Sequence, residues 1–347
     1  MKPYALALVS ILLAASPGIR AETHTFIPTV YYNTYSFAHP PALRIKPGDR
    51  VVTKTIDAAG VDWNGKSVAS GGNPETGPFY IDGAEPGDMI VVTIEKLETN
   101  RATAYASSLL APYTVTPQAI ASRVDRDAKR TTWTIDKARG VARLDQVELQ
   151  PGGIELPLKP MLGCIGVAPA RKEAIATGVP GAFGGNMDYA SMGAGVKLML
   201  PVNEPGALLF LGDGHARQGE GEACGTGVEV AMNTVLIVDL IPGVLTPWPR
   251  LESDDYLMSV GAARPLENAY RVAQVDMTDW LAELCGVDRL DAYQIVAQAA
   301  LAPVAQVCNP IYTVTSKIAK SLLPANPAYR AVHAALGEQA AVYRAEH

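Results

Sequence analysis

Short runs of β-branched and aliphatic residues, separated by turns that contain Gly or Pro, recur from residue 26 to about residue 251. Clear examples are the runs over 51–56, 89–94 and 131–135. Runs of this length between turn residues are typical of β-strands. The sequence therefore predicts a mainly β body, arranged as a sandwich or in a barrel-like way.

A Pro-Gly pair precedes three of the predicted strands. The pairs lie at 47–48, 86–87 and 205–206, and a strand is expected directly after each. Pro fixes the φ of the first central position of a type II turn, and Gly accepts the positive φ of the second. We expect the chain to enter these three strands through the same kind of turn.

The pattern changes after about Asp255. Helices are predicted over 279–284, with Gly286 as C-cap, and over 291–301, 312–323 and 328–345, with Pro residues between them. The predicted organisation is a signal peptide over 1–21, a β-rich catalytic body over 22–254 and a helical C-terminal region over 255–347 that packs on the body. The fold class is then α+β overall.

The first 21 residues have the pattern of an export signal. Lys2 precedes an apolar run over 4–15, and Ala21 offers a small residue for cleavage before Glu22. No later segment is long and apolar enough to cross a bilayer. The sequence predicts an exported protein, periplasmic or secreted, without stable membrane insertion after cleavage; an uncleaved N-terminal anchor is the alternative.

The charge balance excludes some classes of partner. The chain has 29 basic and 35 acidic residues, a net charge of −6, and removal of Lys2 and Arg20 leaves 27 against 35, or −8. Proteins that coat nucleic acid or bind membranes through basic clusters carry the opposite charge. No nucleic-acid partner is therefore expected.

Four cysteines are spread widely along the chain, without a CxxC pair, so a structural zinc cluster is not favoured. In an oxidising compartment, Cys285 and Cys308 are the better candidates for a disulfide, because both fall in a predicted helical stretch. Four isolated buried thiols are the alternative.

The segment around His215 gives the strongest chemical signal. Asp213 and His215 are two residues apart, so on an extended backbone both side chains point to one face, as two ligands of a zinc-like ion would. Glu220 and Glu222 follow as candidate general bases. A Gly-rich acidic hairpin at the surface is the structural alternative.

Three further places carry chemistry-bearing residues. Asp188 follows a glycine-dense stretch over 180–187, Asp57 ends a predicted strand, and the loop over 71–80 contains glycines near Asn73. Cys164 is a possible nucleophile, although its apolar neighbours favour a small buried residue. Each acid could equally be a turn or strand-end residue.

The sequence resembles the acetamidase/formamidase family over most of the chain after the signal. The resemblance is carried by NPETGPFYIDGAEPGD (73–88), LPLKPMLGCIGVAPA (156–170), PGAFGGNMD (180–188), LPVNEPGALLFLGDGHARQGEGE (200–222) and GTGVEV (225–230). It implies hydrolysis of a small amide to a carboxylate and ammonia, a mainly β fold and a homo-oligomer, often a dimer. Glu220 stands where the family pattern has Asp, and an export signal departs from the family's usual cytoplasmic enzymes.

Residue patterns and resemblance together suggest a metal-assisted amidase. The hypothesis places a divalent ion (Zn²⁺, with Ca²⁺ or Mn²⁺ as alternatives) on Asp188, Asp213 and His215, with Asp57 as a further ligand. Glu222 is the expected general base. The substrate amide is expected to be oriented by Asn73 and by the N–H groups around Gly184 and Gly185.

Two other functions stay open from the sequence. In one, Cys164 attacks the amide through a thioester, which predicts sensitivity to thiol alkylation and indifference to chelators. In the other, the exported protein binds a small polar ligand without turnover. Acids gathered around one histidine argue against simple binding, because such acids destabilise a fold unless an ion or a reaction requires them.

Overall fold

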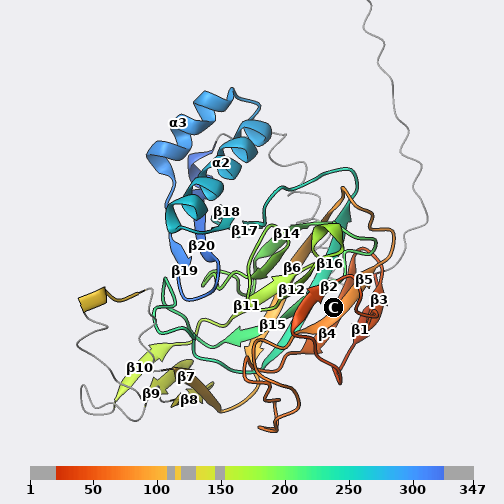
Figure 1. Ribbon diagram of the computed structural model, residues 1–347, viewed down its shortest axis with the longest axis vertical. Coiled ribbons are helices and arrows are strands. Elements are labelled where there is room, and N and C mark those ends of the chain that lie inside the picture. Colours follow the sequence, from red (N-terminus) through yellow and green to blue (C-terminus); the bar gives the residue numbers. More distant parts are fainter. Residues whose placement is uncertain (1–20, 108–113, 119–129, 145–152, 324–347) are drawn as a thin grey trace, which may run out of the picture.

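The computed structural model describes residues 21–107, 114–118, 130–144 and 153–323, and all structural statements concern these residues. The predicted helix over 328–345 and nearly all of the predicted signal peptide lie outside them. Two large sheets form the centre of the molecule, with two helices at one end and a small sheet at the other (Figure 1). The mainly β fold with helices near the C-terminus is confirmed.

The largest sheet has nine strands in the order β1-β4-β16-β6-β14-β17-β18-β20-β19. They are β1 (Thr23–Thr25), β4 (Asp49–Lys54), β6 (Met89–Thr99), β14 (Lys197–Pro201), β16 (Met232–Ile241), β17 (Arg250–Glu252), β18 (Tyr256–Ala263), β19 (Val304–Gln306) and β20 (Tyr312–Ala319). Only β1 and β4 pair in parallel. Because β17 pairs with β18, this sheet continues from the predicted body into the C-terminal region.

Three smaller sheets complete the β structure. The five-stranded sheet contains β3 (Leu43–Ile45), β5 (Thr76–Ile81), β11 (Met161–Gly166), β13 (Gly184–Asn186) and β15 (Leu209–His215), in the order β13-β11-β15-β5-β3. The four-stranded sheet contains β7 (Thr103–Ser107), β8 (Arg130–Asp136), β9 (Val141–Leu144) and β10 (Ile154–Pro157). β2 (Thr34–Ser36) pairs with β12 (Ala174–Ala176), and η1 (Ala170–Lys172) and η2 (Lys320–Leu322) are short 3₁₀ turns.

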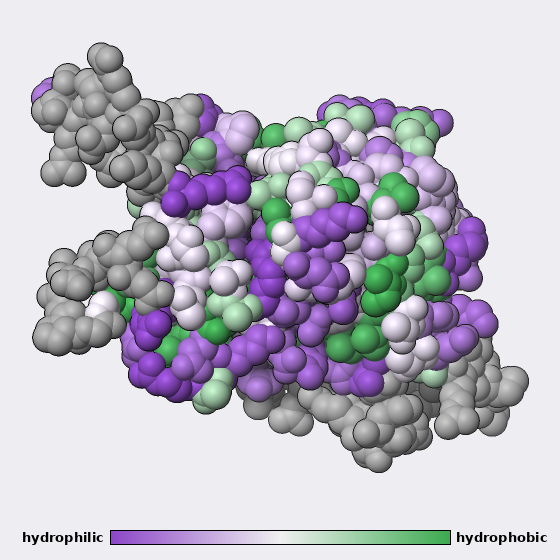
Figure 2. All heavy atoms as spheres, turned by 90° about the horizontal axis from the view of Figure 1, so that it is seen from below, coloured by the Kyte–Doolittle hydropathy of each residue, from purple (hydrophilic) through white to green (hydrophobic). Residues whose placement is uncertain are grey.

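Alternation along β6 explains how the layers pack. Ile90 and Val92 join a hydrophobic cluster with Leu211 of the five-stranded sheet, whereas Met89 and Val91 join a second cluster with helix α2 (Leu266–Cys285). Successive side chains of a strand point to opposite faces, so one face of the large sheet packs on the other sheet and the opposite face packs on the helices. On the face seen from below, polar side chains separate small hydrophobic patches (Figure 2).

The helices are α2 (Leu266–Cys285) and α3 (Arg289–Ala299). Gly286 has the left-handed conformation at the C-cap of α2, as predicted. The predicted helix over 312–323 is wrong, because β20 occupies Tyr312–Ala319. Its β-branched residues at 313–315 favour a strand. No helix of the described residues is long and apolar enough to cross a membrane.

The three Pro-Gly turns form as predicted. Gly48, Gly87 and Gly206 have φ values of 89°, 101° and 76°. In each turn the residue after Gly donates its N–H to the carbonyl three residues earlier, at 2.9–3.0 Å. The turns deliver the chain into β4 and β6, and into β15 two residues further on.

The predicted disulfide is absent. All four cysteines are free, and Cys308 lies in the loop between β19 and β20 rather than in a helix with Cys285. The helical assignment that suggested the pairing was therefore wrong for Cys308.

Candidate active site

Residues from distant parts of the chain form one buried cluster, called here the His215 cluster. Asp213 and His215 lie on β15, Asp188 follows β13, and Glu222 and Glu229 lie between β15 and β16. His215 is fully buried and each acid is at most 6% exposed. The fold thus brings together Asp188, Asp213, His215 and Glu222 of the predicted site and adds Glu229.

Their side chains are close enough to share an ion. His215 Nε2 lies 3.4 Å from Asp213 Oδ1 and 3.0 Å from Glu229 Oε1. The ligand atoms of Asp188, His215 and Glu222 lie within 4.8 Å of one another, and so do those of Asp213, His215 and Glu229. Both groups use His215, so they describe two ways of holding one ion at the same place.

Several atoms of the cluster lack hydrogen-bond partners among the described residues. These buried atoms are Asp188 Oδ1, Asp213 Oδ1, His215 Nε2 and Glu229 Oε2. A buried polar atom without a partner is destabilising unless a ligand satisfies it. No lysine or arginine of the described residues forms an ion pair with these acids, so a cation fits the set.

Gln218 determines which nitrogen of His215 is available. The Gln218 Nε2 group donates to the carbonyls of Asp188 (2.6 Å) and Ala305 (3.2 Å), so its Oε1 faces His215 Nδ1 at 2.9 Å. Oε1 can only accept, and His215 Nδ1 must therefore carry the hydrogen. In the neutral ring, the lone pair is then on Nε2, which faces the acids, as a metal ligand requires.

Burial and mutual repulsion raise the pKa of Asp188, Glu222 and Glu229, whereas for Asp213 the charge of His215 outweighs burial and lowers the pKa. Burial, and then the charge of Asp213, raise the pKa of Asp188 to about 7 and of Glu229 to about 8. Burial and the charge of Asp188 also raise the pKa of Glu222 well above its usual range. Although burial lowers the pKa of His215, the charges of Glu229 and Asp213 raise it well above its ordinary value. Without a cation, protons offset the charge; a bound cation would take their place.

The backbone of the site is unusual. Asn73, Asp188, Asp213 and Glu222 all have positive φ, between 46° and 56°, a conformation that non-glycine residues rarely adopt. Such residues concentrate at functional sites, where the surrounding structure holds them. Gly163 of β11 leaves room for the acids, since a Cβ there would come 2.4 Å from Asp188 Oδ1 and 2.6 Å from Asp213 Oδ2.

Of the other predicted site residues, Asn73 reaches the His215 cluster and Asp57 does not. Asn73 reaches the cluster, because its Nδ2 donates to Asp213 Oδ2 at 3.0 Å. Asp57 does not: its carboxylate pairs with Arg101 at 2.5 Å and accepts two backbone N–H groups. The N–H of Gly184 donates to the Gly181 carbonyl, and a Cβ at Gly185 would lie 2.4 Å from the Val179 carbonyl oxygen.

Gly184 and Gly185 are thus accounted for by close backbone packing. Asp57 stabilises its own loop and lies in neither ligand group. Glu220 is exposed and also lies outside both groups.

Cys164 is poorly placed as a nucleophile. Its thiol is fully buried and donates to Asn186 Oδ1 at 2.8 Å. Burial, followed by the charges of Glu75 and Asp213, raises the thiol pKa well above its usual range. The thiolate is the reactive form, so this surrounding opposes nucleophilic attack by Cys164.

Sequence reasoning missed four residues of the site. Glu229 lies in the GTGVEV stretch, and Glu75, on which the charges of Asp213 and Asp188 act, lies in the motif over 73–88, so both are inside segments that carry the family resemblance. Gln218 lies three residues after His215. Asn309 Nδ2 donates to Asp188 Oδ2 at 2.6 Å, but Asn309 comes from the region predicted to be helical, and no sequence pattern pointed to it.

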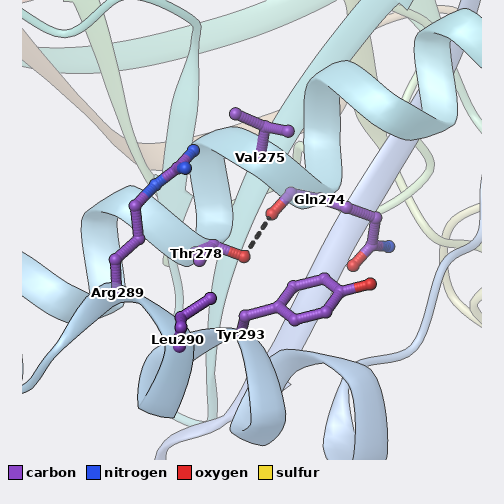
Figure 3. A pocket seen from close by; sticks show the side chains of 6 residues that line it. All are labelled: Gln274, Val275, Thr278, Arg289, Leu290 and Tyr293. Atoms are coloured by element: carbon purple, nitrogen blue, oxygen red, sulfur yellow. Dashed lines mark hydrogen bonds between the residues drawn. The ribbon is translucent and has the colours of Figure 1, made fainter.

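A hollow of about 260 Å³ lies between α2 and α3 and shares no lining residue with the His215 cluster (Figure 3). Its lining residues are Gln274, Val275, Thr278, Arg289, Leu290 and Tyr293. Arg289 pairs with Asp279, and the lining contains no acid, histidine or thiol. The chemistry therefore belongs to the His215 cluster.

Comparison with known proteins gives consistent results. Residues 170–318 match the model of the Acetamidase/Formamidase family. The structure resembles that of an acetamidase from Yersinia enterocolitica, with 32% identity, a TM-score of 0.77, and coverage of 88% of this chain and 94% of the other.

An acetamidase from Bacillus halodurans is similar at 27% identity, with a TM-score of 0.73 and coverage of 85% and 97%. A predicted acetamidase/formamidase from Thermoanaerobacter tengcongensis is similar at 26% identity, with a TM-score of 0.73 and coverage of 87% and 97%. No match is found among proteins of curated function.

Proposed function

Because the chain belongs to the acetamidase/formamidase family, we propose that it cleaves a small aliphatic amide to a carboxylate and ammonia. The amide is of the size of formamide or acetamide, and a divalent ion assists the reaction. That it is a hydrolase acting on amide C–N bonds follows from the family and its acetamidase relatives. The observation that carries the ion is the set of unpartnered ligand atoms around His215 Nε2.

The residues that would hold the ion are Asp188, Asp213 and His215, with Glu229 completing the set, which leaves Glu222 free to act as the base. Carboxylate and imidazole ligands suit Zn²⁺ best, and Ca²⁺ or Mn²⁺ less well. When bound, such an ion supplies a Lewis acid for the amide carbonyl and lowers the pKa of a bound water molecule to about 7.

The protein's own groups contribute proton transfer and orientation. Glu222 accepts a proton from the attacking water and passes it to the leaving nitrogen; it can do so once a bound cation offsets the neighbouring negative charges that raise its pKa. Gln218 holds the His215 ring, and Asn73 and Asn309 each hold one oxygen of a cluster acid. Burial excludes bulk water and strengthens these interactions.

The test is ammonia release from formamide, acetamide and propionamide, before and after chelation and metal return. We expect release that stops on chelation. His215→Ala should lose activity and bound metal together. His39 lies outside the His215 cluster, where its ring forms a hydrogen bond with the Thr34 hydroxyl, so His39→Ala should keep both activity and metal. Full activity of His215→Ala would contradict the proposal.

Other outcomes select the alternatives. Release that ignores chelators but stops on thiol alkylation would favour Cys164 as nucleophile. Saturable binding of a small polar ligand without ammonia release from any amide would favour a binding protein.

We also propose export and a homodimer. Cleavage before Glu22 would leave β1 intact, since Glu22 N–H donates to Asp49 Oδ1 at 2.8 Å and its carbonyl accepts from Arg50 N–H. N-terminal sequencing of the protein recovered outside the cytoplasm should begin at Glu22, and recovery of the uncleaved chain from membranes would contradict export.

The homodimer is tested by the mass of the protein in solution, which should be twice that of one chain.

A further inference from the structure

A second set of buried polar groups lies next to the His215 cluster and is not used by the proposed reaction. Glu75, just before β5, and Tyr35, on β2, are both 0% exposed. Both oxygens of the Glu75 carboxylate lack a hydrogen-bond partner among the described residues, and so does the Tyr35 hydroxyl. The charge of Glu75 acts on the Tyr35 hydroxyl, so the two groups are neighbours, and three unsatisfied buried polar atoms together indicate a missing ligand.

The place is continuous with the reaction site. A Cβ at Gly212 would come 2.7 Å from Glu75 Oε2, and Gly212 is the direct neighbour of Asp213. The charges of Asp213 and Asp188 act on Glu75, and after burial they contribute to raising its pKa. The Glu75 carboxyl group therefore lies beside the acids that would hold the ion.

The neighbouring donors are already used. Asn73 Nδ2 donates to Asp213 Oδ2 (3.0 Å) and Asn186 Oδ1 (3.2 Å), which occupies both of its hydrogens. The Cys164 thiol donates to Asn186 Oδ1 at 2.8 Å. The Cys164 sulfur also interacts with the Tyr35 hydroxyl and with Glu75, but a thiol is a weak partner and its hydrogen is directed to Asn186, so both groups retain hydrogen-bonding capacity for a ligand.

The ligand must supply hydrogen-bond donors to Glu75 and an acceptor for the Tyr35 hydroxyl. A primary amide has this combination, with two N–H groups and a carbonyl oxygen. An ester of the same acid has no N–H to offer. From this pattern we infer that Glu75 binds the NH₂ group of the substrate and, with Tyr35, selects primary amides. The inference rests on the proposed function and assigns the residue that recognises the nitrogen.

The test compares an amide with an ester that carries the same acyl group. For Glu75→Gln, which keeps one acceptor oxygen and replaces the other with an NH₂ group that cannot accept from the substrate, we expect kcat/KM for acetamide to fall about 10- to 100-fold. Phenyl acetate hydrolysis should change less than about threefold, and bound metal should stay at the wild-type level. Tyr35→Phe should reduce acetamide hydrolysis in the same selective way.

The matched control is Glu98→Gln, at an exposed glutamate that pairs with Lys96, and it should leave both substrates unaffected. Binding is measured separately by calorimetry in the Glu222→Gln background, where turnover is slowed. There, Glu75→Gln should weaken acetamide binding by a similar factor.

Three results for Glu75→Gln would each overturn the inference: an equal fall in kcat/KM for amide and ester, an unchanged kcat/KM for acetamide, or loss of bound metal. None of them would contradict amide hydrolysis by the wild-type chain. Absence of ammonia release from the wild-type chain would instead contradict the proposed function on which the inference rests.

Discussion

At the residue scale, the absence of a single side chain makes room for the site. Gly163 lies under the carboxylates of Asp188 and Asp213, which occupy the space where a Cβ would stand. The φ of Gly163 is not in the left-handed region, so alanine can adopt the same backbone conformation. The methyl group of alanine would clash only with the two carboxylates.

Gly163→Ala should therefore leave the protein folded but push the two acids from their positions. We expect metal affinity to fall about 10- to 100-fold and amide hydrolysis to fall with it, because ligand orientation controls both. Gly178→Ala is the control, since nothing lies within 4 Å of a Cβ there. Bound metal and activity equal to the wild type in Gly163→Ala would show that the acids do not need this space.

At the element scale, a buried ion pair attaches helix α2 to the large sheet. Asp276 of α2 accepts two hydrogen bonds from Arg250 of β17, at 2.8 and 3.0 Å, and one from Ser259 of β18 at 2.5 Å. Gly261 allows the close approach of β18, since a Cβ there would lie 2.2 Å from the Ala269 carbonyl oxygen of the helix.

Asp276→Ala should lower the free energy of unfolding by about 3–5 kcal/mol, because it leaves the Arg250 charge buried without a partner. Asp279→Ala, also on α2, breaks an exposed pair with Arg289 of α3 and should change the free energy of unfolding by about 0–1 kcal/mol. Urea unfolding of both variants measures the difference. Equal values would mean that the buried pair does not attach the helix.

At the scale of the whole molecule, stability should depend on pH through Asp239 of β16. Burial raises the pKa of this carboxyl group from 3.8 to about 6. Between these values the unfolded chain loses the proton and the folded chain keeps it, so unfolding becomes easier as pH rises. The destabilisation is complete above about pH 6 and absent below about pH 4.

Asp239→Asn removes this titration. Relative to the wild type, the variant should gain about 3 kcal/mol of stability between pH 4 and pH 7. Unfolding midpoints and free energies at the two pH values measure the gain. Asp254→Asn, at an exposed position, should show no such gain, and a pH-independent difference for Asp239→Asn would rule out the mechanism.

The sequence by itself determined the local structure. The Pro-Gly turns, the strand runs and the Gly286 cap depend on φ preferences and on alternation between neighbours, which act over a few residues. Asp213 and His215 came together for the same reason, since they are two residues apart on one strand. The prediction of a helix over 312–323 was wrong because it followed the helical composition of the surrounding region. The β-branched residues of this segment favour the strand that forms there.

Only the tertiary structure decided which distant groups meet. Asn309 reaches Asp188 across 121 residues, Asn73 reaches Asp213 across 140, and Asp57 turns instead to Arg101. These contacts follow from the order of strands in the sheets and from glycines that let backbones and carboxylates approach. Sheet order depends on packing between segments far apart in the chain, so no local pattern could specify which acids would be left without partners around His215.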